Sequence, residues 1–236
     1  MSRLRVQMSM LASALLLSAA AAAQTHIPAT GLCNTGLTPA SPLPTGCTTS
    51  TPVTPVNPES GGSSVDGNWQ LATPYPSAPY NQQAPDPCKL TTFGPAWVDA
   101  PWPTWFNPDD GLSQWITPLA ELAAGGWYIY RTALRIPPIR PRGAKYVLTV
   151  AGQALVDDDL AAIVIEDPAG YTPYCRLVAV PLIGSGWTAW HPFNFSVPVI
   201  PNTDAFLYFI TYNDEQSGGS AAGLRVEFTS AYFTPQ

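Results

Sequence analysis

The densest group of ionisable side chains in this sequence is a run of three carboxylates, Asp157, Asp158 and Asp159. Side chains alternate between the two faces of an extended strand, so Asp157 and Asp159 are expected on one face and Asp158 on the other. Two such carboxylates could hold Ca²⁺, a hard cation that prefers several oxygen ligands. They could equally form a charged strand end that discourages edge-to-edge pairing. A structural calcium ion at Asp157 and Asp159 is the only cofactor that the sequence suggests.

Side chains for nucleophilic or metal-dependent catalysis are scarce. The sequence has 2 histidines, His26 and His191, and no Gly-x-Ser-x-Gly elbow accompanies them. The metal-binding spacings His-Glu-x-x-His and paired Cys-x-x-Cys are missing as well. A glycoside hydrolase needs only two carboxylates across a cleft, so a carboxylate-dependent glycan hydrolase is the enzymatic alternative. The sequence favours a protein that is not an enzyme.

Tryptophans give a stronger functional lead. Trp102 and Trp105 lie close together among proline and aspartate residues, and a second pair occurs at positions 187 and 190. Exposed tryptophan and tyrosine rings can stack on the apolar faces of sugars, and a β-sandwich presents such rings on the loops at one end. Tryptophan more often fills a core, so we expect only one or two of these rings to face a ligand. The candidate ligand-binding residues are Trp102, Trp105, Trp187, Trp190 and Tyr212.

The 4 cysteines of the sequence allow three pairings. Cys33 and Cys47 share one loop-rich stretch, whereas Cys88 and Cys175 lie in the part of the chain that is expected to fold. We therefore favour the disulfides Cys33–Cys47 and Cys88–Cys175, which would form in an oxidising compartment.

The elements that would position these side chains are β-strands. Between residues 128 and 136 the even positions carry Tyr, Tyr, Thr, Leu and Ile, while two odd positions carry arginine. This period of two is typical of a half-buried strand. Near the C-terminus, residues 224, 226 and 228 are apolar and alternate with Arg225, Glu227 and Thr229, which the same pattern places on the opposite face. Further strands are expected at 146–150, 160–165, 176–183, 187–197 and 206–212. About eight or nine strands separated by turn residues predict an all-β fold, a β-sandwich or jelly roll.

Three segments are expected along the chain. Residues 1–23 carry Arg3 and Arg5, an apolar core and an alanine run, which is the pattern of a secretory signal peptide. Residues 24–64 are rich in Thr, Pro and Ser, with few large apolar side chains, so we predict a mostly disordered arm. Residues 65–236 are predicted to form the β-sandwich. The protein should therefore be secreted or extracytoplasmic. No membrane span is expected after the leader is removed, because the apolar core of the leader is too short to cross a bilayer.

The composition excludes one class of partner. Only 11% of the residues are charged, less than half the usual share of about 25%. The formal net charge is −6, and loss of Arg3 and Arg5 with the leader would lower it by two. Nucleic-acid binding requires a basic surface, so nucleic acid is not an expected partner.

Several short motifs follow one another in an order that is typical of a known family. They are NTGL (34–37), VDGNWQL (65–71), SQWITP (113–118), WYIYRTALRI (127–136), VDDDLAAIVIED (156–167) and YNDEQSGGSAAGLRVEF (212–228). Together they resemble the galactose-binding-like β-sandwich of bacterial exported proteins that carry a PEP-CTERM sorting tail. The resemblance covers most of residues 34–230 and implies a fold more than an activity. The sequence departs from the family pattern in a longer loop that holds Cys175 and in the absence of the sorting tail. The resemblance therefore implies a free or non-covalently held variant.

These observations lead to one expected function and two alternatives. We expect a secreted, non-catalytic binding module that recognises glycan or other cell-surface or matrix material. The first alternative is a structural or adhesive surface protein that binds protein partners through an exposed apolar patch. The second is the carboxylate-dependent hydrolase described above.

Overall fold

The computed structural model describes the chain in separate stretches. These are residues 26–52, 64–76, 84–99, 105–108, 110–118, 123–138, 145–167, 174–179, 186–199, 204–214 and 221–236. The signal peptide predicted for residues 1–23 lies outside these stretches, and so does Trp102.

Nearly all regular structure in the described residues is β. The only helical turn among them is the 3-10 helix η1, Pro87–Lys89. Nine of the strands have five residues or more, which agrees with the eight or nine expected from the sequence. Three others have only two residues each, too few for a period of two to be recognised. The strands are β1 Ile27–Pro28, β2 Thr51–Pro52, β3 Ser64–Pro76, β4 Gly94–Val98, β5 Ile116–Thr117, β6 Gly126–Arg135, β7 Tyr146–Asp157, β8 Asp159–Asp167, β9 Tyr174–Ala179, β10 His191–Val199, β11 Asp204–Asn213 and β12 Gly223–Pro235.

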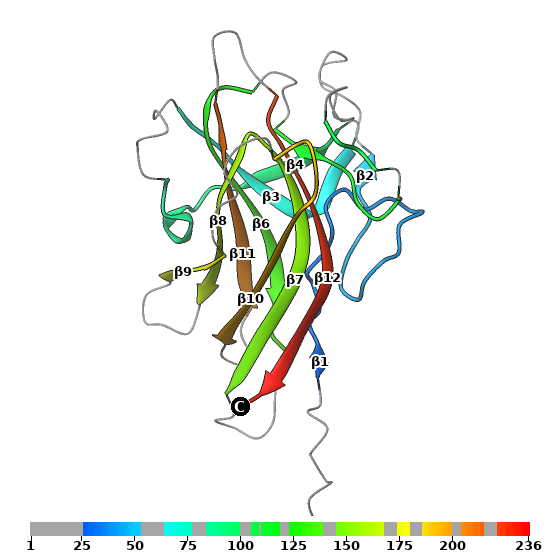
Figure 1. The fold of residues 1–236 in the computed structure, drawn as a ribbon, viewed down its shortest axis with the longest axis vertical. Coiled ribbons are helices and arrows are strands. Elements are labelled where there is room, and N and C mark those ends of the chain that lie inside the picture. Colours follow the sequence, from blue (N-terminus) through cyan, green and yellow to red (C-terminus); the bar gives the residue numbers. More distant parts are fainter. Residues whose placement is uncertain are drawn as a thin grey trace, which may run out of the picture.

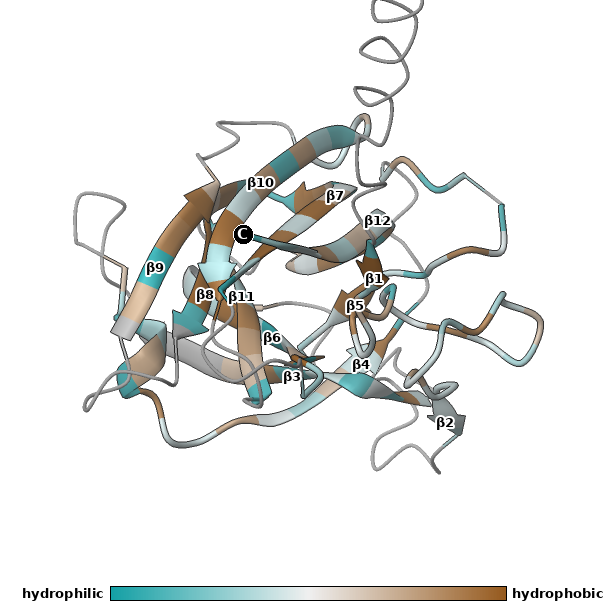
Figure 2. Cartoon of the chain, turned by 90° about the horizontal axis from the view of Figure 1, so that it is seen from below, coloured by the Kyte–Doolittle hydropathy of each residue, from teal (hydrophilic) through white to brown (hydrophobic). Residues whose placement is uncertain are grey.

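These strands form one continuous antiparallel sheet that folds over on itself (Figure 1). The hydrogen-bonded order is β10-β7-β12-β5-β4-β3-β6-β11-β8-β9, with β1 beside β12 and β2 beside β3. Seen from below, β10, β7 and β12 lie on one side of the interior, and β6, β11 and β8 lie on the other (Figure 2). The main core fills the space between these two halves with Leu148 and Val226 from one side and Leu134 and Phe209 from the other. The prediction of an all-β, sandwich-like fold is confirmed.

The two ends of the sandwich differ in how their outer faces are covered. From Tyr146 to Ala154, β7 alternates between buried and partly exposed residues, as a half-buried strand should. Its last three residues, from Leu155 to Asp157, are all buried, and so are the first five of β12. The end at which β7 finishes and β12 begins is therefore covered on both faces. We call it the capped end, and it lies opposite the C-terminus (Figure 1).

The N-terminal arm is part of this fold over residues 26–52. Leu32, Cys33 and Leu37 are buried. Thr35 links two segments, because its N–H and Oγ1 form hydrogen bonds with the backbone of Val226 while its C=O and Oγ1 bind the backbone of Gln114. Of the arm predicted at 24–64, residues 26–52 are thus held in place, while residues 24–25 and 53–63 lie outside the described stretches. Backbone hydrogen bonds and a disulfide hold the segment, so it does not need many large apolar side chains to be ordered.

Both favoured disulfides are present. Cys33 is bonded to Cys47 and Cys88 to Cys175. Two disulfides fit an oxidising, extracellular compartment. No helix in the described part of the chain is long and apolar enough to cross a bilayer.

Candidate functional site

A cluster of tryptophans covers the outer face of the sheet at the capped end. Trp105 and Trp115 are buried with their ring centroids 4.1 Å apart, and they pack on Leu155 of β7. Trp187 and Trp190 pack against the same group and stay partly exposed. We call these five residues the tryptophan cluster.

The loops that carry this cluster are tied to each other and to the sheet. The N–H of Phe106 donates a hydrogen bond of 2.8 Å to the C=O of Trp187, so the loops around residues 105 and 187 are joined. Gly223 lets the Trp105 ring approach β12, since a Cβ at residue 223 would lie 2.7 Å from Cη2 of that ring. A glycine is therefore required here for close packing.

A carboxyl group lies under Trp105. The indole Nε1 of Trp105 donates a hydrogen bond of 3.2 Å to Oδ2 of Asp157. Burial, followed by the charge and hydrogen bond of neighbouring Asp158, raises the pKa of Asp157 to about 8, although the bond from Trp105 lowers it. Asp157 is thus protonated at neutral pH.

The expectation that Asp157 and Asp159 share one strand face is wrong. The chain bends at Asp158, so that Asp157 ends β7 opposite Gly223 of β12, and Asp159 begins β8 opposite Tyr212 of β11. The two carboxylates therefore belong to different ladders. In the described residues, one group of three potential metal ligands gathers: Asp86, Cys88 and Cys175. Its two cysteines form a disulfide, so this group cannot supply thiolates to a metal.

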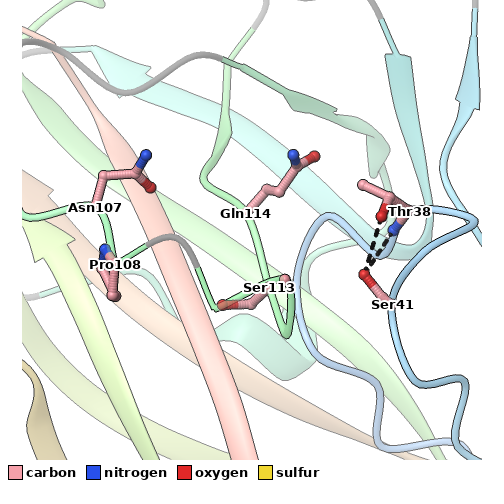
Figure 3. Close-up of a pocket in the computed structure, with 7 residues that line it drawn as sticks. Thr38, Ser41, Asn107, Pro108, Ser113 and Gln114 are labelled. Carbon is pink, nitrogen blue, oxygen red and sulfur yellow. Dashed lines mark hydrogen bonds between the residues drawn. The ribbon is translucent and has the colours of Figure 1, made fainter.

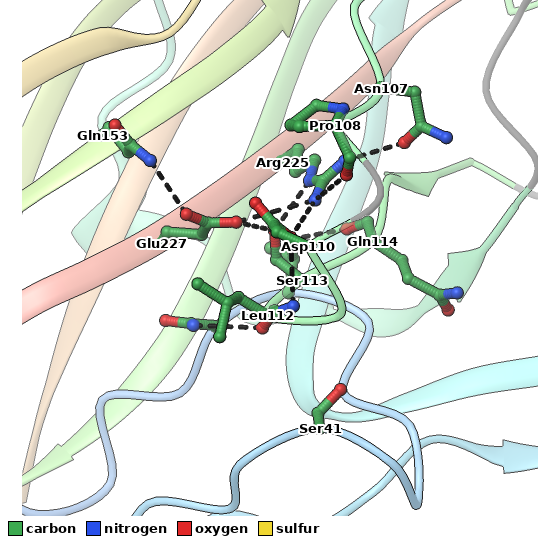
Figure 4. Close-up of polar contacts among 12 residues, drawn as sticks. Ser41, Asn107, Pro108, Asp110, Leu112, Ser113, Gln114, Gln153, Arg225 and Glu227 are labelled. Carbon is green, nitrogen blue, oxygen red and sulfur yellow. Dashed lines mark hydrogen bonds and ion pairs between the residues drawn. The ribbon is translucent and has the colours of Figure 1, made fainter.

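Beside the tryptophan cluster, Arg225 is buried within a polar network (Figure 4). Its guanidinium donates to Ser113 Oγ at 2.7 Å, to Asn107 Oδ1 at 2.7 Å, and to both Pro108 O and Asp110 Oδ1 at 3.1 Å. It also lies 3.6 Å from Oε1 of Glu227. We call this set, with Gln153, the Arg225 network.

Glu227 completes the Arg225 network from the same strand. Its Oε1 accepts a hydrogen bond of 2.7 Å from Ser113, and its Oε2 accepts one of 2.8 Å from Gln153. The Arg225 guanidinium also lies 5.2 Å from the ring centroid of Trp190, within the range of a cation–π contact. The network therefore fastens the loop around residues 107–113 to the outer face of β12.

A small polar pocket opens between this loop and the N-terminal arm (Figure 3). Its volume is about 80 Å³. On the arm side, Thr38 and Ser41 are hydrogen bonded to each other through their hydroxyls at 3.1 Å. On the loop side, Asn107 and Gln114 are exposed and carry amide groups at the pocket. The lining residues are Thr38, Ser41, Asn107, Pro108, Gly111, Ser113 and Gln114.

The structure brings together three of the five aromatic residues that the sequence suggested. Trp105, Trp187 and Trp190 meet in the tryptophan cluster, although Trp105 is buried and acts as its base. Tyr212 lies elsewhere, buried in a second cluster with its ring centroid 4.8 Å from that of Trp127. Trp102 is outside the described residues.

The residues that hold the site in place were not predicted from the sequence. Arg225 and Glu227 were assigned only to the face of the last strand opposite the apolar one, and that face turns out to be covered at the capped end. A usable signal does exist in the sequence, namely an Arg and a Glu two residues apart on one strand face in a chain with few charges. Opposite charges at that spacing can pair under a covering loop.

Comparisons with known proteins add little to what this geometry indicates about function. No family model and no curated protein matches the chain. Among solved structures, the chain is similar to a family 35 carbohydrate binding module from an environmental isolate. The identity is 15%, the match covers 59% of this chain and 85% of that chain, and the TM-score is 0.28. A likeness at this level carries no argument about function, which must rest on the residues of this chain.

Proposed function

We propose that the chain is a secreted, non-catalytic binding module of the galactose-binding-like type, which recognises glycan on cell-surface or matrix material. The observation that carries this proposal is the pairing of aromatic rings with a polar pocket at the capped end. Phe106 is 41% exposed, and Trp187 and Trp190 are partly exposed beside it. Sugars present apolar ring faces and rows of hydroxyls, and these match aromatic side chains and fixed amide and hydroxyl groups respectively.

The electrostatics of the capped end favour an uncharged saccharide. Arg225 is 1% exposed and its donors are directed at groups of the protein, so its charge is not offered to a ligand. Glu227 and Asp110 together outweigh that charge by one unit, which disfavours an acidic ligand, and burial raises the pKa of Asp157 to about 8. Binding should therefore depend little on ionic strength, unlike the recognition of sulfated or other acidic glycans.

Phe106 offers the sharpest test, because its exposed ring can be removed without emptying the core. The mature chain is first screened on a glycan array, and the best hit is then titrated into Phe106→Ala and the control Leu177→Ala. Leu177 is 59% exposed on β9. Loss of one stacked ring should weaken binding by about 1–2 kcal/mol, or roughly five- to thirtyfold. The proposal fails if no glycan binds, or if Phe106→Ala and Leu177→Ala behave alike.

A second candidate function, adhesion to protein partners, is favoured by the apolar side chains on the same loop. Phe106 and Leu112 are 41% and 39% exposed, and a contiguous exposed apolar patch is typical of protein interfaces. Binding to a cell surface or matrix before and after enzymatic deglycosylation separates the two functions. Binding that survives deglycosylation would favour adhesion, and binding that is lost would favour glycan recognition.

A further inference from the structure

A larger cavity lies on the outer face of the opposite half of the sandwich. Its volume is about 470 Å³, within the range of about 300–1,000 Å³ that is typical of small-molecule sites. One wall is the disulfide loop, with Gly31, Cys33, Thr45 and Gly46, and the other is the sheet. On the sheet side it is lined by Asn68 of β3, Ala133 and Arg135 of β6, and Asp204 and Phe206 of β11. We call it the β6–β11 groove.

Glycines let the disulfide loop lie close to the sheet and so define the wall of the groove. Gly31 has φ +90° and Gly46 has φ +89°, backbone conformations that other residues rarely adopt. A Cβ at Gly31 would lie 3.2 Å from the C=O oxygen of Ala133. The backbone of Arg135 is fixed to the arm as well, because its N–H donates a hydrogen bond of 3.2 Å to the C=O of Thr30. The groove is therefore a built feature of the fold.

Two opposite charges at the groove keep hydrogen-bonding capacity for a ligand. Arg135 Nε lies 3.8 Å from Oδ1 of Asp204, too far for a hydrogen bond. Both side chains are about three-quarters exposed, at 76% and 75%. A carboxylate can accept hydrogen bonds from two neighbouring hydroxyls, and a guanidinium can donate to two oxygens. Because the two charges cancel, the pair suits a polyhydroxylated ligand without net charge.

An aromatic ring stands beside this polar pair. Phe206 is partly exposed and lines the groove. The guanidinium of Arg131 lies between Phe206 and Phe93, at 4.2 Å and 3.6 Å from their ring centroids, and so holds Phe206 in place. A fixed ring at the edge of a polar groove provides a surface for the apolar face of a sugar ring.

The sheet itself argues against a peptide in this groove. β6 is hydrogen bonded to β3 and β11, and β11 to β6 and β8. Neither strand has a free edge to which an extended peptide could add. A ligand must therefore be held by side chains and by the disulfide loop.

We propose that the β6–β11 groove is a second saccharide site, which binds an uncharged glycan through Arg135 and Asp204 and stacks a sugar ring on Phe206. The site shares no lining residue with the polar pocket, so the proposal does not rest on the function proposed for the capped end.

The test is a titration of the ¹⁵N-labelled mature chain with four neutral probes: cellohexaose, mannohexaose, xylohexaose and a β-1,4-galactan hexasaccharide. Amide signals of Gly31 and Gly46 report on the groove, and those of Gly111 report on the polar pocket. We expect at least one probe to shift the two groove glycines. The double variant Arg135→Gln/Asp204→Asn, which leaves the net charge unchanged, should weaken that binding at least tenfold. Lys145→Gln is the control, an exposed change in a residue that does not line the groove.

Each outcome decides the proposal. It is overturned if no probe shifts the groove glycines at millimolar concentration, or if the double variant binds as tightly as the Lys145→Gln control. Shifts confined to Gly111 and weakened by Phe106→Ala would support the capped end alone and overturn the second site. Shifts confined to Gly31 and Gly46, and lost in the double variant, would support the groove even where the capped end fails.

Discussion

The Arg225 network makes a quantitative prediction about stability. Replacing Arg225 by Met keeps much of the side-chain volume but removes the only cation paired with Glu227 in the network, whose side chain is 5% exposed. Glu227 would keep its hydrogen bonds from Ser113 and Gln153 but would be a buried charge without a counter-ion. Breaking a buried pair in this way costs about 3–5 kcal/mol. For a chain of this size that corresponds to a fall in Tm of about 6–20 °C.

The double variant Arg225→Met/Glu227→Met distinguishes the cost of an unpaired buried charge from the cost of lost side-chain packing. In Arg225→Met and in the double variant alike, Asn107, the C=O of Pro108 and Asp110 lose their donor. The double variant also removes the buried charge of Glu227, and what it adds in cost is the loss of an acceptor for Ser113 and Gln153, about 1 kcal/mol each. The double variant should therefore be more stable than Arg225→Met alone.

Urea unfolding followed by near-ultraviolet circular dichroism gives the free energies of unfolding of the parent chain, Arg225→Met, Glu227→Met and the double variant, since the tryptophan cluster reports on the packing beside Arg225. Two results would refute the reasoning. One is a Tm for Arg225→Met within about 2 °C of the parent chain, a change expected from less than about 1 kcal/mol. The other is a double variant whose loss equals the sum of the two single losses.

Two further predictions concern Asp157 and the disulfides. The pKa of Asp157 is raised to about 8 in the folded chain, against about 3.9 in the unfolded chain. The folded state therefore binds one more proton between these pH values, and its stability falls as the pH rises through them. Asp157→Asn should lessen that fall, and melting temperatures from pH 4 to 9 that change equally with pH in both chains would contradict it. Replacing Cys88 and Cys175 by serine opens a loop with a sequence separation of 87 and should lower the free energy of unfolding by about 4–5 kcal/mol. The same change at Cys33 and Cys47, separated by 14, should lower it by about 3 kcal/mol. Only the Cys33 and Cys47 change should also weaken saccharide binding, because that loop forms a wall of both cavities; equal binding by the two serine variants in a calorimetric titration would count against this.

Much of the fold could be predicted because strand periodicity is a local property. The alternation over residues 128–136 corresponds to β6, Gly126–Arg135, in which Thr132 and Leu134 are buried and Ala133 and Arg135 are exposed. The disulfide pairing followed from the separation of arm and sandwich cysteines along the chain. The strand expected at 187–197 begins only at His191, because residues 186–189 form a turn whose Trp187 packs into the tryptophan cluster.

The candidate site was harder to predict, because alternation tells which face a side chain takes but not what covers that face. Leu155 and Arg225 are paired neighbours on the outer face of β7 and β12, where a sandwich normally meets solvent. They are buried because the loop bearing Trp105 and Trp115 lies over them. Nothing in the local sequence of either strand encodes that distant loop. The same lack of local information explains the burial of Asp157, for which the sequence suggested a calcium ligand or a charged strand end.

Residues 26–52 of the arm show what composition alone does not reveal. A segment poor in large apolar residues is expected to stay disordered when its ordering must be offset by its own burial. Residues 34–36 are ordered by other means. The side chain of Asn34 accepts a hydrogen bond from the N–H of Phe228 and donates one to the C=O of Leu112, and the N–H of Gly36 donates to Asp66 at 2.6 Å. Asp66 is buried, which raises its pKa, while the hydrogen bonds from Gly36 and from the backbone of Asn68 and Trp69 lower it. A short polar turn can therefore be locked to three distant strands and loops by its backbone and one amide. This makes the arm the wall of both cavities.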